Sequence, residues 1–212
     1  MERIIAASKN RHKIEEIEKI TARAWLRVVS RADAGVPDDL EVVEDGLTFE
    51  ENSRKKAETI MRVTGEPAIA DDSGLMVDAL DGRPGVFSAR FAGEEADDEA
   101  NNDKLLALLA GVPAEERGAR FVSVITLVWP DGRVLTARGE CPGRILMERR
   151  GKGGFGYDPL FLPDGCSETF AELSADAKNR ISHRARALEE LARLLREAGS
   201  RDAGGPKKEP GR

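Results

Sequence analysis

The stretch FVSVITLVWPDGRVLT (residues 121–136) contains two strand-like runs and the turn between them. Phe121 to Trp129 alternates like a strand, and Pro130-Asp131-Gly132-Arg133 supplies turn residues before Val134-Leu135-Thr136. Because a tight turn joins antiparallel strands, this stretch predicts a hairpin within the sheet.

Strand-like and helical patterns alternate over the rest of the chain. Short apolar runs at residues 4–7, 27–30 and 68–70 predict strands. Helical spacing follows Asn10, and a capping box of Thr48 and Glu51 predicts a helix that stops at Gly65. Two further helices are predicted, from Asp97 to Leu109 with its leucines facing inward, and from Ser182 onward. Strands interleaved with helices, together with one hairpin, indicate an α/β domain with a mixed sheet.

Composition indicates one compact domain. The chain has 212 residues, of which 40% are hydrophobic and 34% charged, so it can bury a core without disulfides. We assign the domain to residues 1–198 and expect the Gly, Pro and Lys-rich tail, 199–212, to be disordered. Cys141 and Cys166 show neither a zinc-binding nor a disulfide pattern.

Charge and hydropathy exclude two kinds of partner. The 33 basic and 39 acidic side chains give a net charge of -6, which repels a nucleic-acid polymer but permits a small anion in a basic pocket. No run approaches the roughly 20 apolar residues of a membrane span, and the N-terminus has no signal-peptide core. We therefore expect a cytoplasmic protein without a membrane partner.

A phosphate-binding pattern lies where the first strand meets the first helix. Residues 8–13 read SKNRHK, so hydroxyl, amide and cationic side chains gather at a helix N-terminus, where free N–H groups favour a phosphate. The same residues equally fit an ordinary helix cap with solvated charges.

Two adjacent acids, Asp71 and Asp72, follow the apolar run 68–70 and precede Ser73-Gly74. We place them at the end of a strand, where they would hold Mg²⁺ and orient a water molecule. Glu44 and Asp45 in the preceding loop are candidates to complete the metal site. The alternatives are an Asx-turn for the first pair and solvated loop acids for the second.

Two later segments have the residues for binding a base. The run GGFGYDP (153–159) combines backbone freedom, two aromatic rings and a carboxylate, which suits a loop over a planar base or a structural turn with core aromatics. Ser182-His183-Arg184, preceded by Lys178, begins a helix, and by itself this segment fits a capped helix with surface charges better than a binding site.

Taken together and in order, these segments closely resemble the inosine triphosphate pyrophosphatase family, the non-canonical purine nucleoside triphosphate pyrophosphatases. The resemblance extends to about Leu195 and rests on six segments: Ser8-x-Asn10-x-x-Lys13, Gly46-Leu47-Thr48-Phe49-x-Glu51-Asn52, Ala70-Asp71-Asp72-Ser73-Gly74-Leu75, Pro84-Gly85-x-x-Ser88-Ala89-Arg90, Gly154-Phe155-Gly156-Tyr157-Asp158-Pro159 and Ser182-His183-Arg184.

The resemblance implies Mg²⁺-dependent hydrolysis of dITP, ITP and XTP to the monophosphate and pyrophosphate. It implies a homodimer of elongated α/β subunits, each with a mixed sheet flanked by helices and two lobes around a central cleft. Asp72 would be the catalytic residue and a metal ligand, with Glu44 or Glu41 as the second ligand. The triphosphate would be held by Ser8, Lys9, Asn10, Arg11, His12, Lys13 and Lys56. The nucleotide would be contacted by Ser73, Phe155, Gly156, Tyr157, Asp158, Lys178, His183 and Arg184.

Hydrogen-bond polarity provides a hypothesis for base choice. Hypoxanthine and xanthine present an acceptor at position 6, where adenine presents a donor, so donors such as His183 and Arg184 would disfavour adenine. Two alternatives remain at this point: a Maf-type nucleotide pyrophosphatase of similar fold, and a nucleotide sensor without catalysis.

Overall fold

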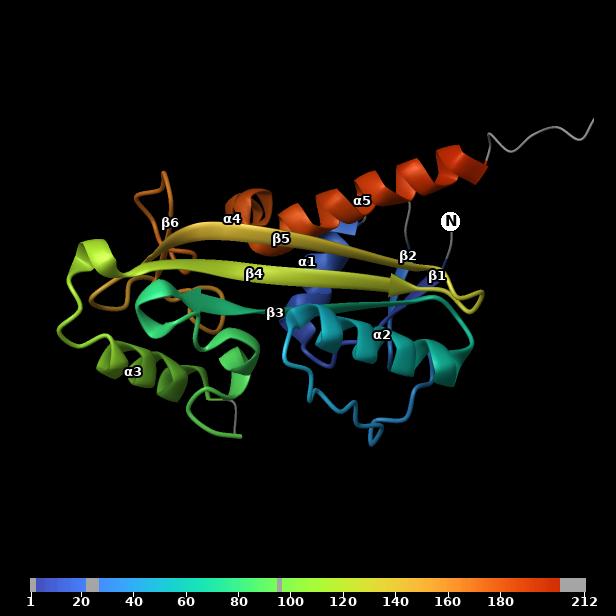
Figure 1. The fold of residues 1–212 in the computed structure, drawn as a ribbon, viewed down its shortest axis with the longest axis horizontal. Helices are drawn as coiled ribbons and strands as arrows, with labels where there is room; N and C mark the ends of the chain where they lie inside the picture. Colours follow the sequence, from blue (N-terminus) through green and yellow to red (C-terminus); the bar gives the residue numbers. More distant parts are fainter. Residues whose placement is uncertain (1–2, 22–26, 95–96, 203–212) are drawn as a thin grey trace, which may run out of the picture.

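The computed structural model describes residues 3–21, 27–94 and 97–202, which form an elongated mixed sheet with helices on both faces (Figure 1). Within these residues the sheet has six strands in the order β2-β1-β3-β4-β5-β6. Strand β1 is parallel to β2 and β3, whereas the pairs from β3 to β6 are antiparallel. The strands are β1 (Arg3–Ala6), β2 (Arg27–Ser30), β3 (Ala68–Val77), β4 (Gly118–Val128), β5 (Val134–Ile145) and β6 (Phe161–Pro163).

The helices cover both faces because the central strands are apolar on both sides. Ile4 packs with residues of α1 and α5, whereas its neighbour Ile5 packs with residues of α2. The helices are α1 (Arg11–Thr21), α2 (Phe49–Thr64), α3 (Asp98–Leu108), α4 (Ala175–Ile181) and α5 (His183–Asp202), with short 3₁₀ turns η1 (Asp78–Leu80), η2 (Gly85–Arg90) and η3 (Ala114–Glu116). The predicted α/β fold class is confirmed.

Two core regions lie at opposite ends of the long strands β3, β4 and β5. One contains Ile69 and Leu127 under α5, and the other contains Leu75 and Phe121 near α3. The acidic segment of β3 lies between these two regions, which correspond to the two predicted lobes.

The predicted position of the paired acids at a strand end is wrong. Strand β3 continues to Val77 because β4 pairs with it along its whole length, from Ala68↔Val128 to Val77↔Ala119. Since neighbouring side chains in a strand point to opposite faces, Asp71 and Asp72 are directed to different sides of the sheet. Strand β1 ends at Ala6, so β3 loses its parallel neighbour just before these acids.

Helix boundaries largely follow the local signals in the sequence. Thr48 Oγ1 accepts from Glu51 N at 3.1 Å, and α2 ends at Gly65 with a φ of 67°. The inward packing predicted for Leu108 is wrong, because this side chain is 40% exposed. The predicted domain boundary at residue 198 falls inside α5, which continues to Asp202, and residues 203–212 of the predicted tail lie outside the described residues. No helix in the described ranges is long and apolar enough to cross a membrane.

Candidate active site

Two neighbouring cavities open beside the acidic segment of β3. The first, here called the aromatic cavity, has about 610 Å³ of empty space, its open mouth included, and is lined by Phe121, Phe155, Tyr157 and His183 among others. The second, here called the charged cavity, has about 1070 Å³ measured in the same way. Four residues line both cavities, which therefore form one continuous site: Asn10, Lys13, Ser73 and Ala89.

Lys56 links two carboxylates in the charged cavity. Its Nζ lies 2.6 Å from Asp72 Oδ1 and 3.2 Å from Glu44 Oε2. Burial raises the pKa of Asp72 above its ordinary value, although the nearby charge of Lys56 opposes this. Burial alone would lower the pKa of Lys56, but the charges of Asp72 and Glu44 raise it. Lys56 therefore stays protonated beside Asp72, whose carboxylate has a raised pKa.

Asp71 is the anionic centre on the other face of the sheet. Its Oδ2 lies 3.0 Å from Lys13 Nζ and 3.1 Å from Arg184 Nη2, and Ser123 donates to Oδ1. Burial by itself would raise the pKa of Asp71, but Arg184 and Lys13 hold it well below its usual range. Asp71 is therefore a permanent anion that fixes the positions of two cations at the junction of the two cavities.

The predicted phosphate segment lies at the start of α1, on the wall of the charged cavity. Ser8 Oγ accepts from Asn10 N at 3.0 Å, and Asn10 Oδ1 accepts from Lys13 N at 3.2 Å. These bonds form the turn that leads from β1 into the helix. Lys9 also lines this cavity, with its Nζ donating to the carbonyl of Asp38 at 2.9 Å. The predicted side chains of Arg11 and His12 lie outside the described residues, although the backbone of both belongs to α1.

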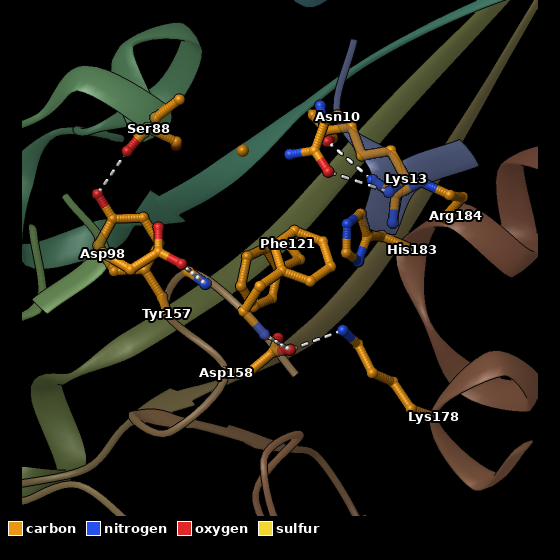
Figure 2. A pocket seen from close by; sticks show the side chains of 15 residues that line it. Asn10, Lys13, Ser88, Asp98, Phe121, Tyr157, Asp158, Lys178, His183 and Arg184 are labelled. Atoms are coloured by element: carbon orange, nitrogen blue, oxygen red, sulfur yellow. Dashed lines mark hydrogen bonds and ion pairs between the residues drawn. The ribbon is translucent and has the colours of Figure 1, made fainter. Parts of the chain in front are cut away.

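The aromatic cavity is built on a stack of two rings (Figure 2). The rings of Phe121 and His183 lie 4.8 Å apart at an interplanar angle of 12°. Burial and the charge of Arg184 hold the pKa of His183 well below its usual range, so the imidazole is neutral at pH 7. Its Nδ1 is buried and has no partner among the described residues. A neutral ring with a free polar atom is a suitable wall for a heterocyclic ligand.

The Gly-rich segment forms the opposite wall. Asp158 accepts from Phe155 N at 3.0 Å and from Lys178 Nζ at 2.7 Å, and Lys178 lies 4.7 Å from the centroid of the Phe155 ring. Burial raises the pKa of Asp158, against the opposing charge of Lys178. Tyr157 directs its hydroxyl to the carbonyl of Ser88 at 2.8 Å (Figure 2). These contacts fix Phe155 at the cavity.

Ser73, Gly156, His183 and Arg184, all predicted from the sequence, line the aromatic cavity together with Phe155, Tyr157, Asp158 and Lys178. Arg184 is also bound to Ser73 Oγ at 3.1 Å. The structure therefore brings the predicted base-side residues together at one cavity, and Lys56, Asp72 and Glu44 together at the other.

Sequence reasoning missed Glu16, a residue of α1. Its carboxylate pairs with Arg184 and lies 3.2 Å from Lys178 Nζ, so it joins the two basic side chains of the aromatic cavity. Glu16 lies between the core residues of an amphipathic helix, and nothing in its local sequence distinguishes it from a solvated surface acid. Other lining residues were not predicted as site residues: Ser88, Ala89, Asp98 and Phe121.

Gly74 explains why β3 approaches η2 so closely. A Cβ at this position would lie 2.3 Å from Gly85 O and 2.4 Å from Ser88 Oγ. Ser88 Oγ in turn accepts from Leu75 N at 2.9 Å. The missing side chain lets the Ser88 wall of the cavity hydrogen-bond directly to the strand that holds the acids.

The carboxylates of the charged cavity fit a divalent cation that also binds phosphate. Asp72 Oδ2 is buried and has no hydrogen-bond partner within the described ranges, and Glu44 shares Lys56 with Asp72. No group of three or more His, Cys, Asp and Glu able to hold a metal occurs in the described part of the chain. Mg²⁺ typically uses one or two carboxylates and completes its shell with phosphates and water, so two acids suffice. Asp45 instead pairs with Lys55 at 2.6 Å and does not line the cavity.

Comparison with known proteins identifies the family of the chain. Residues 4–194 match the model of the Ham1 family. The chain is 53% identical to the dITP/XTP pyrophosphatase of Geobacter sulfurreducens, over 89% of this chain and 94% of the relative. It is 51% identical to the dITP/XTP pyrophosphatase of Desulforamulus reducens, over 91% of this chain and 95% of the relative.

Solved structures show the same fold. The Ham1 protein of Coxiella burnetii is 41% identical with a TM-score of 0.82, over 93% of this chain and 100% of that chain. The Staphylococcus aureus Ham1 protein is 39% identical with a TM-score of 0.82, over 92% and 99%. The predicted resemblance is thus confirmed, and the chain belongs to the Ham1 family.

Proposed function

We propose that this protein hydrolyses non-canonical purine nucleoside triphosphates, dITP, ITP and XTP, to the nucleoside monophosphate and pyrophosphate. The observation that carries the proposal is the continuity of the two cavities, which share Asn10, Lys13, Ser73 and Ala89. An aromatic cavity suits a purine, and an adjoining cavity with lysines and carboxylates suits a triphosphate. The names of relatives at about half identity, dITP/XTP pyrophosphatases, support the same activity.

The proposed cofactor is Mg²⁺, held by Asp72 and Glu44. When bound there, it would neutralise charge on the phosphates and promote departure of pyrophosphate. The uncompensated Oδ2 of Asp72 supports this assignment, because a buried carboxylate oxygen without a partner is costly unless a ligand satisfies it. Glu41 also lines the cavity, but the contacts with Lys56 favour Glu44 as the second ligand.

The side chains of the protein have separate tasks. Lys13 and Lys56 reach into the charged cavity from α1 and α2, where they would stabilise negative charge that develops on the departing phosphates. Asp72 would accept the proton of the attacking water. A general base positioned in this way is worth about 10²- to 10⁴-fold in rate.

The base is proposed to be recognised by its 6-oxo group. The neutral ring of His183 can carry a donor N–H, and the buried Nε of Arg184 has no partner among the described residues. Hypoxanthine and xanthine offer an acceptor to such donors, whereas the 6-amino group of adenine would leave them unpaired. Stacking between Phe155 and the Phe121–His183 pair would hold the ring plane.

The proposed assembly is a homodimer, as implied by the family resemblance. The proposed compartment is the cytoplasm, where the nucleotide pool is found. A polymeric nucleic acid remains unfavourable as a partner because the net charge of the chain is -6.

The test is pyrophosphate release from dITP, XTP, dGTP and dATP, with and without Mg²⁺, by the wild type and Asp72→Asn. We expect Mg²⁺-dependent release from dITP and XTP and near-complete loss in the variant, because asparagine supplies neither the charge nor the basicity of Asp72. Asp45→Asn is the matched control, since Asp45 is an exposed acid outside the cavity. Equal rates with all four triphosphates would refute the proposed selectivity. Tight ITP binding without pyrophosphate release would indicate a nucleotide sensor instead.

A further inference from the structure

Helix α3 holds the Gly-rich wall of the aromatic cavity through both backbone polar groups of one residue, Gly156. The carboxylate of Asp98 accepts from Gly156 N at 2.7 Å (Figure 2). Asn102, one turn further along the helix, donates from Nδ2 to Gly156 O at 2.9 Å. Gly156 has a φ of 61° and separates Phe155 from Tyr157, so these two bonds fix the backbone between the two rings.

The same helix also holds a second part of the wall, at Ala89. Asn101 donates from Nδ2 to the carbonyl of Ala89 at 3.1 Å, and its Oδ1 accepts from Ala92 N at 2.6 Å. Ala89 lines the aromatic cavity, whereas Asn101 and Asn102 do not. Two adjacent side chains of α3 therefore bind two segments of the cavity wall, at Ala89 and at Gly156.

The burial of these asparagines is difficult to explain by packing. Asn101 and Asn102 are 2% and 1% exposed, although asparagine is a poor helix former and its amide is costly to bury. Asn102 Oδ1 is buried without a partner among the described residues. A leucine would serve a purely apolar interface better, as Leu105 does one turn later.

We infer that α3 fixes the position of the Ala89 and Gly156 segments of the aromatic cavity, and that Asn101 and Asn102 are positioning residues for recognition of the base. This inference rests on the proposed hydrolysis of purine triphosphates. Losing the Asn102 bond releases Gly156 O and lets the Phe155 and Tyr157 rings move, without disturbing Lys13, Lys56 or Asp72. The expected consequence is weaker binding of the base, with unchanged binding of the phosphates and an unchanged rate of hydrolysis.

Kinetics of Asn102→Ala test this separation. We expect the KM for ITP to rise about fivefold, the usual effect of one lost hydrogen bond, with kcat within about twofold of the wild type. Tripolyphosphate has no base, so its inhibition constant should not change. Asp103→Asn is the control on the same helix, because Asp103 is exposed and pairs with Arg149, at 2.7 Å, and not with Gly156 or Ala89.

A second pair of variants covers the case in which Asn102→Ala does not fold. Asp98→Asn keeps an acceptor for Gly156 N, whereas Asp98→Ala removes it. We expect Asp98→Ala to raise the KM for ITP as Asn102→Ala does, and Asp98→Asn to restore most of the affinity.

Fluorine NMR measures the loop independently of activity. Tyr157 is the single tyrosine of the sequence, so protein labelled with 3-fluorotyrosine gives one assigned resonance. We expect a shifted or broadened resonance in Asn102→Ala and an unchanged one in Asp103→Asn.

The outcomes separate this inference from the proposed function. Unchanged KM and an unchanged fluorine resonance in Asn102→Ala would overturn the inference while leaving the hydrolase intact. A parallel loss of kcat and of tripolyphosphate binding would also overturn it, since that result indicates general structural damage. Absence of pyrophosphate release by the wild type would refute the proposed function, and the fluorine spectrum would still decide whether α3 positions the loop.

Discussion

Replacement of Asp71 by asparagine should destabilise the protein strongly. The carboxylate is fully buried and pairs with Lys13 at 3.0 Å and Arg184 at 3.1 Å. Removing one partner of a buried ion pair costs about 3–5 kcal/mol, because the remaining charge is left without compensation. Arg184 retains its pair with Glu16, and asparagine can still accept from Ser123, so we expect about 2–4 kcal/mol.

Urea unfolding of the wild type and Asp71→Asn measures this loss. Asp131→Asn is the control. It makes the same substitution in an ion pair with Arg133 that is about half exposed, and it should leave the free energy of unfolding nearly unchanged. A decrease in the free energy of unfolding of less than about 1 kcal/mol in Asp71→Asn would refute the reasoning. It would mean that Asp71 does not compensate the charges of Lys13 and Arg184 in the folded protein.

The sign of the pH dependence provides a second check on Asp71. Its folded-state pKa lies well below the unfolded value near 3.8, so its contribution is present above that value and is lost as pH falls below it. Asp71→Asn should therefore lose less stability than the wild type between about pH 4 and pH 2. Equal losses in the two proteins would contradict the assignment of Asp71 as a permanent anion.

Two further predictions concern the walls of the cavity. Gly74→Ala should lower the free energy of unfolding by about 1–3 kcal/mol, as expected for overpacking, because the added Cβ would lie 2.3 Å from the carbonyl oxygen of Gly85. Urea unfolding measures this change. An unchanged free energy of unfolding would show that β3 and η2 do not approach each other this closely. The wild type should lose stability as pH falls below about 6.5, by up to about 1.4 kcal/mol per pH unit, because the unfolded chain protonates His183 and the folded protein does not. His183→Gln should remove this part of the slope between pH 5 and 7, and an unchanged slope would show that His183 is charged in the folded state.

Local signals in the sequence were sufficient for much of the fold. The turn at residues 130–133, the Thr48 cap and the stop at Gly65 depend on neighbours within a few positions, and all three occur as predicted. The second bond of the predicted capping box differs, because the Glu51 side chain accepts from Leu47 N and not from Thr48 N. The order of strands and helices follows from the same short-range patterns. All eight residues predicted to contact the nucleotide line the aromatic cavity. They could be predicted because six separate segments carried the resemblance to the family.

Only the tertiary structure decided how the acids are used. Strand β3 continues past Asp71 and Asp72 because β4, about fifty residues later, pairs with it, and no local pattern contains that partner. Alternation along the strand then sends Asp71 to Arg184 and Asp72 to Lys56.

The sequence also did not predict which polar side chains are buried. Glu16 reads as a solvated helix acid, and Asn102 as an ordinary helix residue, because the sequence contains no signal for what packs against them. Their roles depend on Lys178, Arg184 and Gly156, which lie more than fifty positions away. The free energy of burying a polar side chain depends on the groups that replace water around it, and in this protein distant segments supply those groups.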